Sequence, residues 1–201
     1  MMARESAPGR LGLLGTLTSG PCLLELYSEP PTIADLRTCL SKHLIYGQQR
    51  ARDAPSEGGT HRDPAAVTTD HCTWILSAGV PNQLLSELAF ERAVDDPPGI
   101  YRLAGEVRRL GVSIGVVVAT QLPVDRSTLL VRMMAGGALL APAVRELAAL
   151  PEDAFERVMA EPILLRIYDA IEKDTTQPPS RLEQEIMVAV QSLGRRARTQ
   201  S

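Results

Sequence analysis

The residues with the clearest chemical potential lie in the segment CLLELYSEPPTIADLRTCLSKHLIYGQQ. Glu25 stands in an apolar run with strand character, where a carboxylate can serve as a ligand for a hard divalent cation. A magnesium-dependent hydrolase also needs a second acid on a neighbouring strand and a cation beside the attacking water. The preceding run, LGLLGTLT at 11–18, has no acid, and Tyr27 stands where a lysine would be needed. Two of the three groups are therefore missing.

A lysine elsewhere in the chain could replace the missing one. Of 21 basic residues only Lys42 and Lys173 are lysines, and an arginine holds its proton too tightly to act as a base. Lys42 lies roughly 15 Å along the expected helix from its start at Thr32, which places it far from the beginning of that helix. Arg37 is closer and could bind phosphate. A restored catalytic site is thus the less favoured hypothesis.

The order of these features resembles the PD-(D/E)XK nuclease-like fold, in particular the recombination-promoting nuclease and transposase group. The residues LELYS at 24–28 take the place of that family's I-E-x-K-S strand, and QLP at 121–123, followed by TLLVR at 128–132, resembles its second motif. The sequence also looks like uncharacterised bacterial proteins that begin a related block with LGLLG and C-L-x-E. The likeness, over roughly residues 11–135, implies a restriction-endonuclease-like core in which Glu25 is a relic metal ligand.

Three functions are left open by these residues. The favoured one is a non-catalytic relative without a cofactor that binds a protein or a nucleic acid; the phosphate contacts would come from Arg37, Lys42, Arg50 and Arg52. The second is a diverged Mg²⁺-dependent DNA nuclease that uses Glu25 with a migrated partner. The third is a helical oligomerisation protein with the sheet as scaffold. Glu25 itself has an ordinary alternative, an ion pair with an arginine at a sheet edge.

Composition narrows the class of protein. The formal net charge is −3, and 44% of the residues are hydrophobic but only 3% aromatic, which argues against a generic nucleic-acid binder. The three cysteines show neither a CxxC pair nor zinc-ligand spacing, a pattern typical of reduced, cytoplasmic proteins. No signal peptide is evident, and the longest apolar run, 112–120, is about half a membrane span. We therefore predict a soluble, cytoplasmic protein with no membrane partner.

The first part of the chain predicts an α/β core at 11–123. Five segments have strand character and predict a mixed sheet of about five strands: 11–18, 22–28, 73–76, 100–103 and 112–120. The first two flank a Ser-Gly-Pro turn and predict a β-hairpin. The last is nearly all apolar and β-branched, which predicts burial on both faces.

Two helices accompany these strands. Apolar residues at helical spacing predict a helix over 33–52, preceded by a capping box formed by Thr32 and Asp35. Residues 82–90 predict a second helix with Asn82 as its cap. His43 is expected to be packed in the core, whereas His61 and His71 receive no role. Residues 53–70, rich in Pro, Gly and Thr, predict a mobile loop.

The remaining residues, 124–198, predict an all-helical C-terminal extension packed on the core. Five segments punctuated by prolines each fit one short helix, with Pro151 and Pro162 in first-turn positions. These segments are rich in Leu, Ala, Met and Val and offer more apolar surface than a thin α/β layer can cover. They favour a homo-oligomer or a protein partner.

Overall fold

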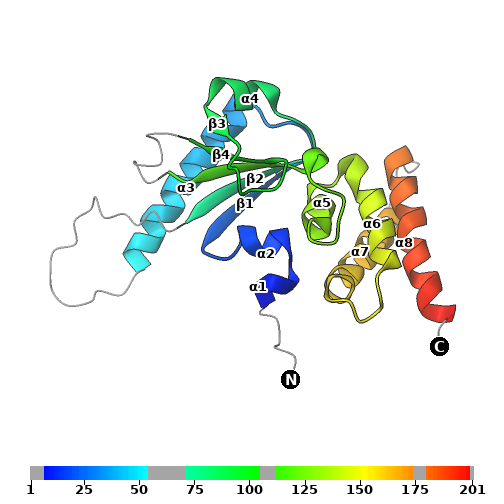
Figure 1. Ribbon diagram of the computed structural model, residues 1–201. Helices are drawn as coiled ribbons and strands as arrows, with labels where there is room; N and C mark the ends of the chain where they lie inside the picture. Colours follow the sequence, from blue (N-terminus) through cyan, green and yellow to red (C-terminus); the bar gives the residue numbers. More distant parts are fainter. Residues whose placement is uncertain (1–6, 54–70, 105–111, 174–179, 200–201) are drawn as a thin grey trace. The chain divides into compact units, whose positions relative to one another are not determined.

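The computed structural model describes residues 7–53, 71–104, 112–173 and 180–199, which form two compact units (Figure 1). The α/β unit comprises Leu17–Pro123, and the helical unit joins Met1–Thr16 to Val124–Ser201. Residues 11–16, assigned to the α/β core from the sequence, therefore group with the helices. The reason is local: the Leu13 N–H donates to the Ser127 carbonyl at 2.7 Å. Packing of the helical unit on the core stays a prediction.

The α/β unit contains a five-stranded mixed sheet in the order β1-β2-β5-β4-β3. The strands are β1 (Cys22–Tyr27), β2 (Cys72–Ser77), β3 (Phe90–Glu91), β4 (Ile100–Leu103) and β5 (Ile114–Val118). β1, β2 and β5 are mutually parallel, whereas β4 and β3 run antiparallel to their neighbours. The predicted α/β class and five-stranded mixed sheet are confirmed.

The predicted hairpin between 11–18 and 22–28 is wrong. Within the first segment the chain forms a short helix, α2 (Leu13–Leu17), and β1 pairs with β2 in parallel. Leucine is a strong helix former and the segment has no valine or isoleucine, so its apolar run carried no real strand preference. β1 is followed by a long helix and then by β2, and such a β-α-β unit places its two strands in parallel.

The predicted long helix is confirmed as α3 (Ile33–Asp53). Its first turn is fixed by the expected capping box: the Asp35 carboxylate accepts from the Thr32 N–H at 2.8 Å, and the Asp35 N–H donates to Thr32 Oγ1 at 3.2 Å. The hydrogen bonds that the Asp35 carboxylate accepts from the N–H and the hydroxyl of Thr32 lower its pKa. The helix buries one stripe against the sheet, formed by Leu36, Cys39, His43 and Gly47.

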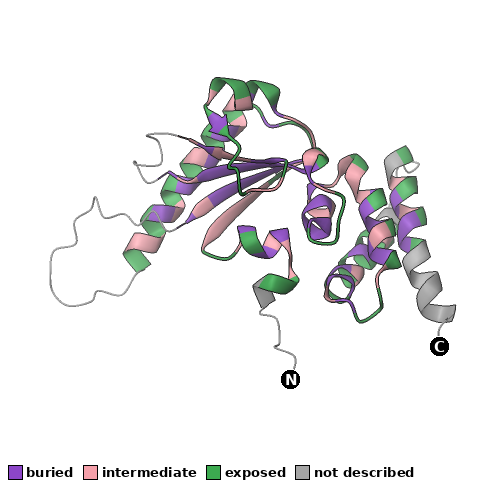
Figure 2. Cartoon of the chain, in the orientation of Figure 1, coloured by how far each residue is buried: buried purple, intermediate pink, exposed green. Residues whose placement is uncertain are grey.

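One face of the sheet packs against α3 and α4 (Asn82–Glu87). Side chains from β2, β5 and both helices form this core: Leu36, Cys39, Ile75, Leu84, Phe90, Leu103, Val112, Ile114, Val116 and Val118. Every residue of β5 is buried, which confirms the prediction for that strand (Figure 2). On α4, Asn82 is the first helical residue rather than the cap, because Pro81 occupies the cap position.

The helical unit contains α1 (Ala7–Arg10), α5 (Leu129–Ala135), α6 (Leu140–Ala149), α7 (Phe155–Lys173) and α8 (Arg181–Thr199). Its core is built mainly from small and aliphatic residues of α6 and α8, including Ala141, Val144, Leu147, Ile186, Ala189 and Val190. The two helices predicted on either side of Pro162 are one continuous helix, α7. Pro162 is exposed, so water can satisfy the carbonyl that its missing N–H leaves without a partner.

Several predictions fall outside the described residues. The expected loop at 53–70 is described only at Asp53, which ends α3, and the arginines at 108 and 109 lie in an undescribed segment. The side chains of the arginines at 195, 196 and 198 are likewise not described.

Candidate functional site

The carboxylate singled out from the sequence is bound by a lysine. Glu25 lies on the edge strand β1, on the side of the sheet that α3 covers, and its Oε2 is 2.7 Å from Nζ of Lys42. The Lys42 side chain is half exposed and that of Glu25 is 20% exposed. The hydrogen bond from the ammonium to Glu25 raises the pKa of Lys42. Glu25 is therefore held in an ion pair, by a lysine rather than the expected arginine.

The expectation that Lys42 lies far from this carboxylate is wrong for a geometric reason. Glu25 lies before the end of β1, so the chain continues beyond Glu25 before α3 begins. α3 then runs back along the sheet in the opposite direction. A helix advances about 1.5 Å per residue and a strand about 3.3 Å. The ten helical residues that separate Lys42 from the cap return the chain to the level of Glu25.

The surroundings of Glu25 do not fit a magnesium site. Within the described part of the chain, the strand that pairs with β1 is β2, which places Ile75 beside Glu25 and contains no acid. Glu29 is exposed in the following turn, and the Asp35 carboxylate is hydrogen-bonded to Thr32. Across the described residues, no group of three or more His, Cys, Asp or Glu side chains is arranged to hold a metal ion. A single, ion-paired carboxylate is a poor donor set for Mg²⁺.

Tyr27, which stands in the lysine position of the resembled motif, hydrogen-bonds with Cys39: its hydroxyl lies 3.4 Å from the Cys39 sulfur. Burial first, and the hydrogen bond to Cys39 second, raise the pKa of Tyr27 far above its ordinary range. Burial likewise raises the pKa of the Cys39 thiol. Both groups are thus neutral near pH 7, so the pair supplies neither a cation nor a nucleophile.

The four residues predicted to contact phosphate do not form one surface. At 100° per residue, Lys42 and Arg50 each point about 140° away from Arg37 around the axis of α3. Lys42 is paired with Glu25, and the Arg50 guanidinium lies 5.9 Å from the Tyr46 ring centre. Arg37 and Arg52 are exposed but about 22 Å apart along the helix. On α3 these cations are therefore dispersed rather than gathered in one stripe, and their contact with phosphate stays a prediction.

The sequence reasoning missed a buried histidine pair on α3 and at the start of β2. His43 is packed as expected, with Nδ1 3.0 Å from the Thr73 hydroxyl. His71, which received no role, is also buried: its ring stacks on His43 at 4.1 Å, and its Nε2 donates to the His43 carbonyl at 3.1 Å. Gly47 leaves the room for the His71 ring, because a Cβ there would lie 2.8 Å from Cε1. Gly47, one turn after His43, is the feature of the sequence that could have indicated a second ring packed there.

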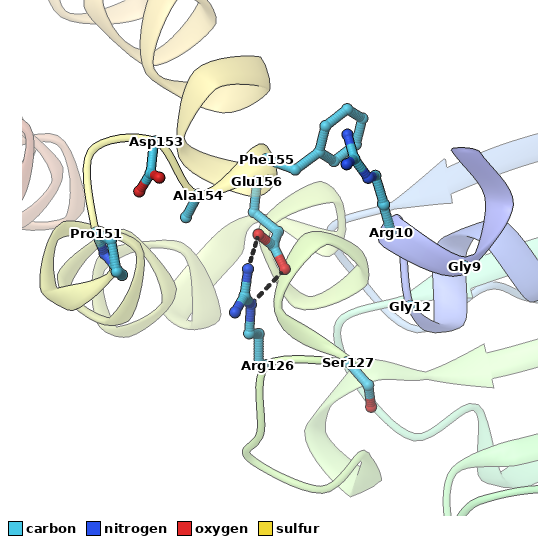
Figure 3. Close-up of a pocket in the computed structure, with 10 residues that line it drawn as sticks. All are labelled: Gly9, Arg10, Gly12, Arg126, Ser127, Pro151, Asp153, Ala154, Phe155 and Glu156. Atoms are coloured by element: carbon cyan, nitrogen blue, oxygen red, sulfur yellow. Dashed lines mark hydrogen bonds and ion pairs between the residues drawn. The ribbon is translucent and has the colours of Figure 1, made fainter. Parts of the chain in front are cut away.

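The helical unit contains a cavity of about 580 Å³, shown in Figure 3. At its centre Arg126 donates two hydrogen bonds to the buried Glu156 carboxylate, at 2.7 and 2.8 Å. These bonds lower the pKa of Glu156, which stays ionised near neutral pH. The Arg10 guanidinium lies 5.8 Å from the Phe155 ring centre on one side, and Asp153 lines the other.

This cavity has the volume of a small-molecule site. Among the described residues that line it, the one hydroxyl, on Ser127, donates to Asp125 at 2.6 Å, and none is a histidine that could serve as its base. The bidentate pair of Arg126 and Glu156 ties the segment before α5 to the first turn of α7. We therefore interpret the cavity as a gap bridged by a structural ion pair.

The most extensive apolar surface of the helical unit lies on α7. Five large apolar side chains of this one helix are at least 39% exposed: Val158, Met159, Ile163, Leu165 and Ile167. At 100° per residue, Val158, Met159, Pro162 and Leu165 lie on the side of α7 opposite the buried residues Ala160 and Leu164, and Ile163 and Ile167 lie between that side and the buried stripe. We call this surface the α7 face.

Comparisons with known proteins do not identify the chain. No protein-family model matches it, and neither a curated protein nor a solved structure matches it significantly. The resemblance to PD-(D/E)XK nucleases therefore stays a hypothesis carried by the sequence motifs. Among the described residues, no helix is both long and apolar enough to cross a membrane.

Proposed function

We propose that this chain is a non-catalytic binding protein that associates with a second copy of itself through the α7 face. The observation that supports this most directly is the concentration of exposed aliphatic side chains on one helix. Isolated exposed apolar residues are normal on a protein surface, whereas contiguous ones mark interaction sites. The proposal combines the favoured binding hypothesis with the predicted homo-oligomer.

The size of the α7 face suits a homodimer. At their exposed fractions its side chains present roughly 400–500 Å² of apolar surface, near the upper end of what monomers leave uncovered. A stable interface buries about 800 Å² per partner, of which about 65% is apolar in homodimers. The α7 face thus supplies about the apolar area that one partner in such a dimer needs.

The charges on the α7 face also permit self-association. A two-fold interface brings the same surface of both copies together, so a face with a net charge would repel itself. On that side of α7 the exposed charged residues are Arg166, Asp169 and Lys173, two cations and one anion. A second copy can therefore cover the face with the Asp169 of each copy opposite a cation of the other, which leaves only a small excess of like charge.

The α/β unit supports the non-catalytic part of the proposal. Glu25 is neutralised by Lys42, its neighbour on β2 is Ile75, and Tyr27 is a neutral hydrogen-bonded phenol. Metal-dependent phosphodiester cleavage needs a charged metal cradle at this position, and these residues do not supply one. The dispersed cations of α3 likewise favour a protein partner over a nucleic acid.

Sedimentation velocity over a wide range of protein concentration tests this function. We expect a wild-type dimer, and a monomer for Ile163→Asp and for Met159→Asp, each checked for folding by circular dichroism. Val94→Asp is the matched control, because Val94 is fully exposed in a loop of the α/β unit. A wild-type monomer, or a dimer that survives both α7 substitutions, contradicts the proposal.

Three further outcomes separate the alternatives. Hydrogen-exchange protection of α7 in a monomer would indicate that the chain itself covers the face. Mg²⁺-dependent cleavage of DNA that is lost in Glu25→Ala would establish the nuclease instead. A shift of duplex DNA that weakens steeply with salt would establish a nucleic-acid partner.

A further inference from the structure

We propose that Cys22 and Cys72 form a redox-active dithiol that closes to a disulfide between β1 and β2 when the protein meets a hydroperoxide. The two cysteines are 50 positions apart in the sequence, and both are reduced in the structure. They are the first residues of their strands and are direct partners in the register of the sheet. This site is independent of the α7 face.

The strand pairing gives the two cysteines the geometry of a disulfide. Neighbouring strands lie about 4.8 Å apart, and the Cα atoms of disulfide-bonded residues lie about 4.4–6.8 Å apart. Register partners in a parallel pair point to the same face of the sheet, so both sulfurs lie on one side. The Cys72 N–H donates to the Pro21 carbonyl at 3.2 Å, which holds this register at the ends of the strands. Closure therefore needs rotation of the side chains and little movement of the backbone.

Cys72 lies beside a fixed cation, and its thiol donates to the Thr73 carbonyl at 3.7 Å, a hydrogen bond that is given up when the thiol loses its proton. Cys72 and Arg102 line the same small cavity, which has room for about one water-sized molecule. The Arg102 guanidinium is fixed by stacking 4.8 Å from the Trp74 ring centre and by an ion pair with Asp96 at 2.6 Å. A fixed cation beside a sulfur stabilises the thiolate, which is the form that reacts with oxidants. The hydrogen bond from Arg102 to Asp96 raises the pKa of Arg102, so the guanidinium stays charged.

Cys22 suits the role of the thiol that attacks Cys72 after Cys72 has been oxidised. Burial raises the pKa of its thiol, so it stays protonated while Cys72 meets the oxidant. Both cysteines are only partly buried, which leaves them accessible to a small peroxide. Cys39 is fully buried against Tyr27 and is a register partner of neither, so it provides an internal control.

The chemistry balances with a hydroperoxide as the oxidant. The Cys72 thiolate attacks the distal peroxide oxygen, the O–O bond breaks, and the alkoxide leaves and takes up a proton. This step forms a sulfenic acid on Cys72. The Cys22 sulfur then attacks the Cys72 sulfur; the S–O bond breaks, and water leaves with the proton from Cys22. Two thiols have lost two electrons, the peroxide has gained them, and the S–S bond joins β1 to β2.

Peptide mapping of the full-length protein tests the pair. The folded protein is treated with hydrogen peroxide, its remaining thiols are blocked with N-ethylmaleimide, and its peptides are analysed without reduction. We expect a linked peptide joining Cys22 to Cys72, with Cys39 recovered as the blocked thiol. The Cys39→Ser variant should give the same link. In Cys22→Ser, Cys72 should instead be trapped as a sulfenic acid by dimedone.

Each other outcome overturns the proposal. A link that contains Cys39, a link only between two chains, or full recovery of all three thiols would show that the register pair is not redox-active. The thermal midpoint provides a second measurement on the wild-type protein alone. It should rise on oxidation, because the crosslink ties the edge strand to the sheet, and it should return after dithiothreitol.

Discussion

Nζ of Lys42 lies 2.7 Å from Oε2 of Glu25, so one of the two lysines of the chain neutralises the carboxylate most suited to metal chemistry. A lysine near a metal-binding glutamate is what the resembled nuclease chemistry uses, but here no second acid lies on the neighbouring strand. The same two side chains that could have marked a catalytic site therefore form an ion pair between β1 and α3.

Removing the lysine tests this interpretation. In Lys42→Met the Glu25 carboxylate loses its partner but gains no further ligand, so Mg²⁺ should not raise the thermal midpoint of the variant or of the wild type. The midpoint itself should fall only slightly, because the pair is partly exposed. A Mg²⁺-dependent rise that disappears in Glu25→Gln would contradict the ion-pair interpretation.

The elements that the sequence predicted well are those with a local cause. α3 follows from the spacing of its apolar residues and from the capping box of Thr32 and Asp35. β5 follows from a run rich in β-branched residues. The strand predicted for LGLLGTLT is wrong because leucine favours a helix and the segment has no valine or isoleucine. What decided it is a tertiary contact, the hydrogen bond from Leu13 to the Ser127 carbonyl.

The candidate sites were harder to predict because they depend on strand register. Nothing in the spacing of Cys22 and Cys72 indicates that they are neighbours; the parallel pairing of β1 with β2 makes them so. The same pairing places Ile75 beside Glu25. The exposed face of α7 could be read only in part, since Pro162 suggested a break where the helix continues.

The capping box of α3 should contribute measurably to stability. Thr32→Ala removes the hydroxyl that accepts from the Asp35 N–H at 3.2 Å and should cost about 1 kcal/mol. Urea unfolding measures this loss. Thr38→Ala is the matched control, because Thr38 lies within the helix and its hydroxyl only donates to the Ala34 carbonyl. Equal losses in the two variants would show that the box has no special role.

The histidine pair should make Gly47 intolerant of a side chain. Gly47→Ala places a Cβ 2.8 Å from Cε1 of His71, and this overpacking should cost about 1–3 kcal/mol despite the better helix propensity of alanine. In a His71→Ala background the ring is gone, so the same substitution should be neutral or stabilising. A loss of equal size in both backgrounds would show that the His71 ring is not what excludes a side chain at Gly47.

The ion pair in the helical unit should make stability depend on pH. The folded-state pKa of Glu156 is lowered, chiefly by its hydrogen bonds to Arg126. Its contribution is therefore complete above the unfolded pKa of about 4.3 and is lost as the pH falls through the lower folded value. Glu156→Gln should lower the free energy of unfolding by about 1–2 kcal/mol at pH 7. The loss should be much smaller at a pH near the lowered folded-state pKa of Glu156. A loss that does not change with pH would contradict the assignment.

The reactivity of Cys72 should follow the charge of Arg102. Arg102→Met removes the cation beside the sulfur and should slow alkylation of Cys72 by iodoacetamide several-fold at neutral pH. Asp96→Asn should act in the opposite direction, because it removes the carboxylate that partly neutralises Arg102. Rates are measured peptide by peptide, with the buried Cys39 as an internal check that each variant is folded. Equal rates in the two variants would show that Arg102 does not activate this thiol.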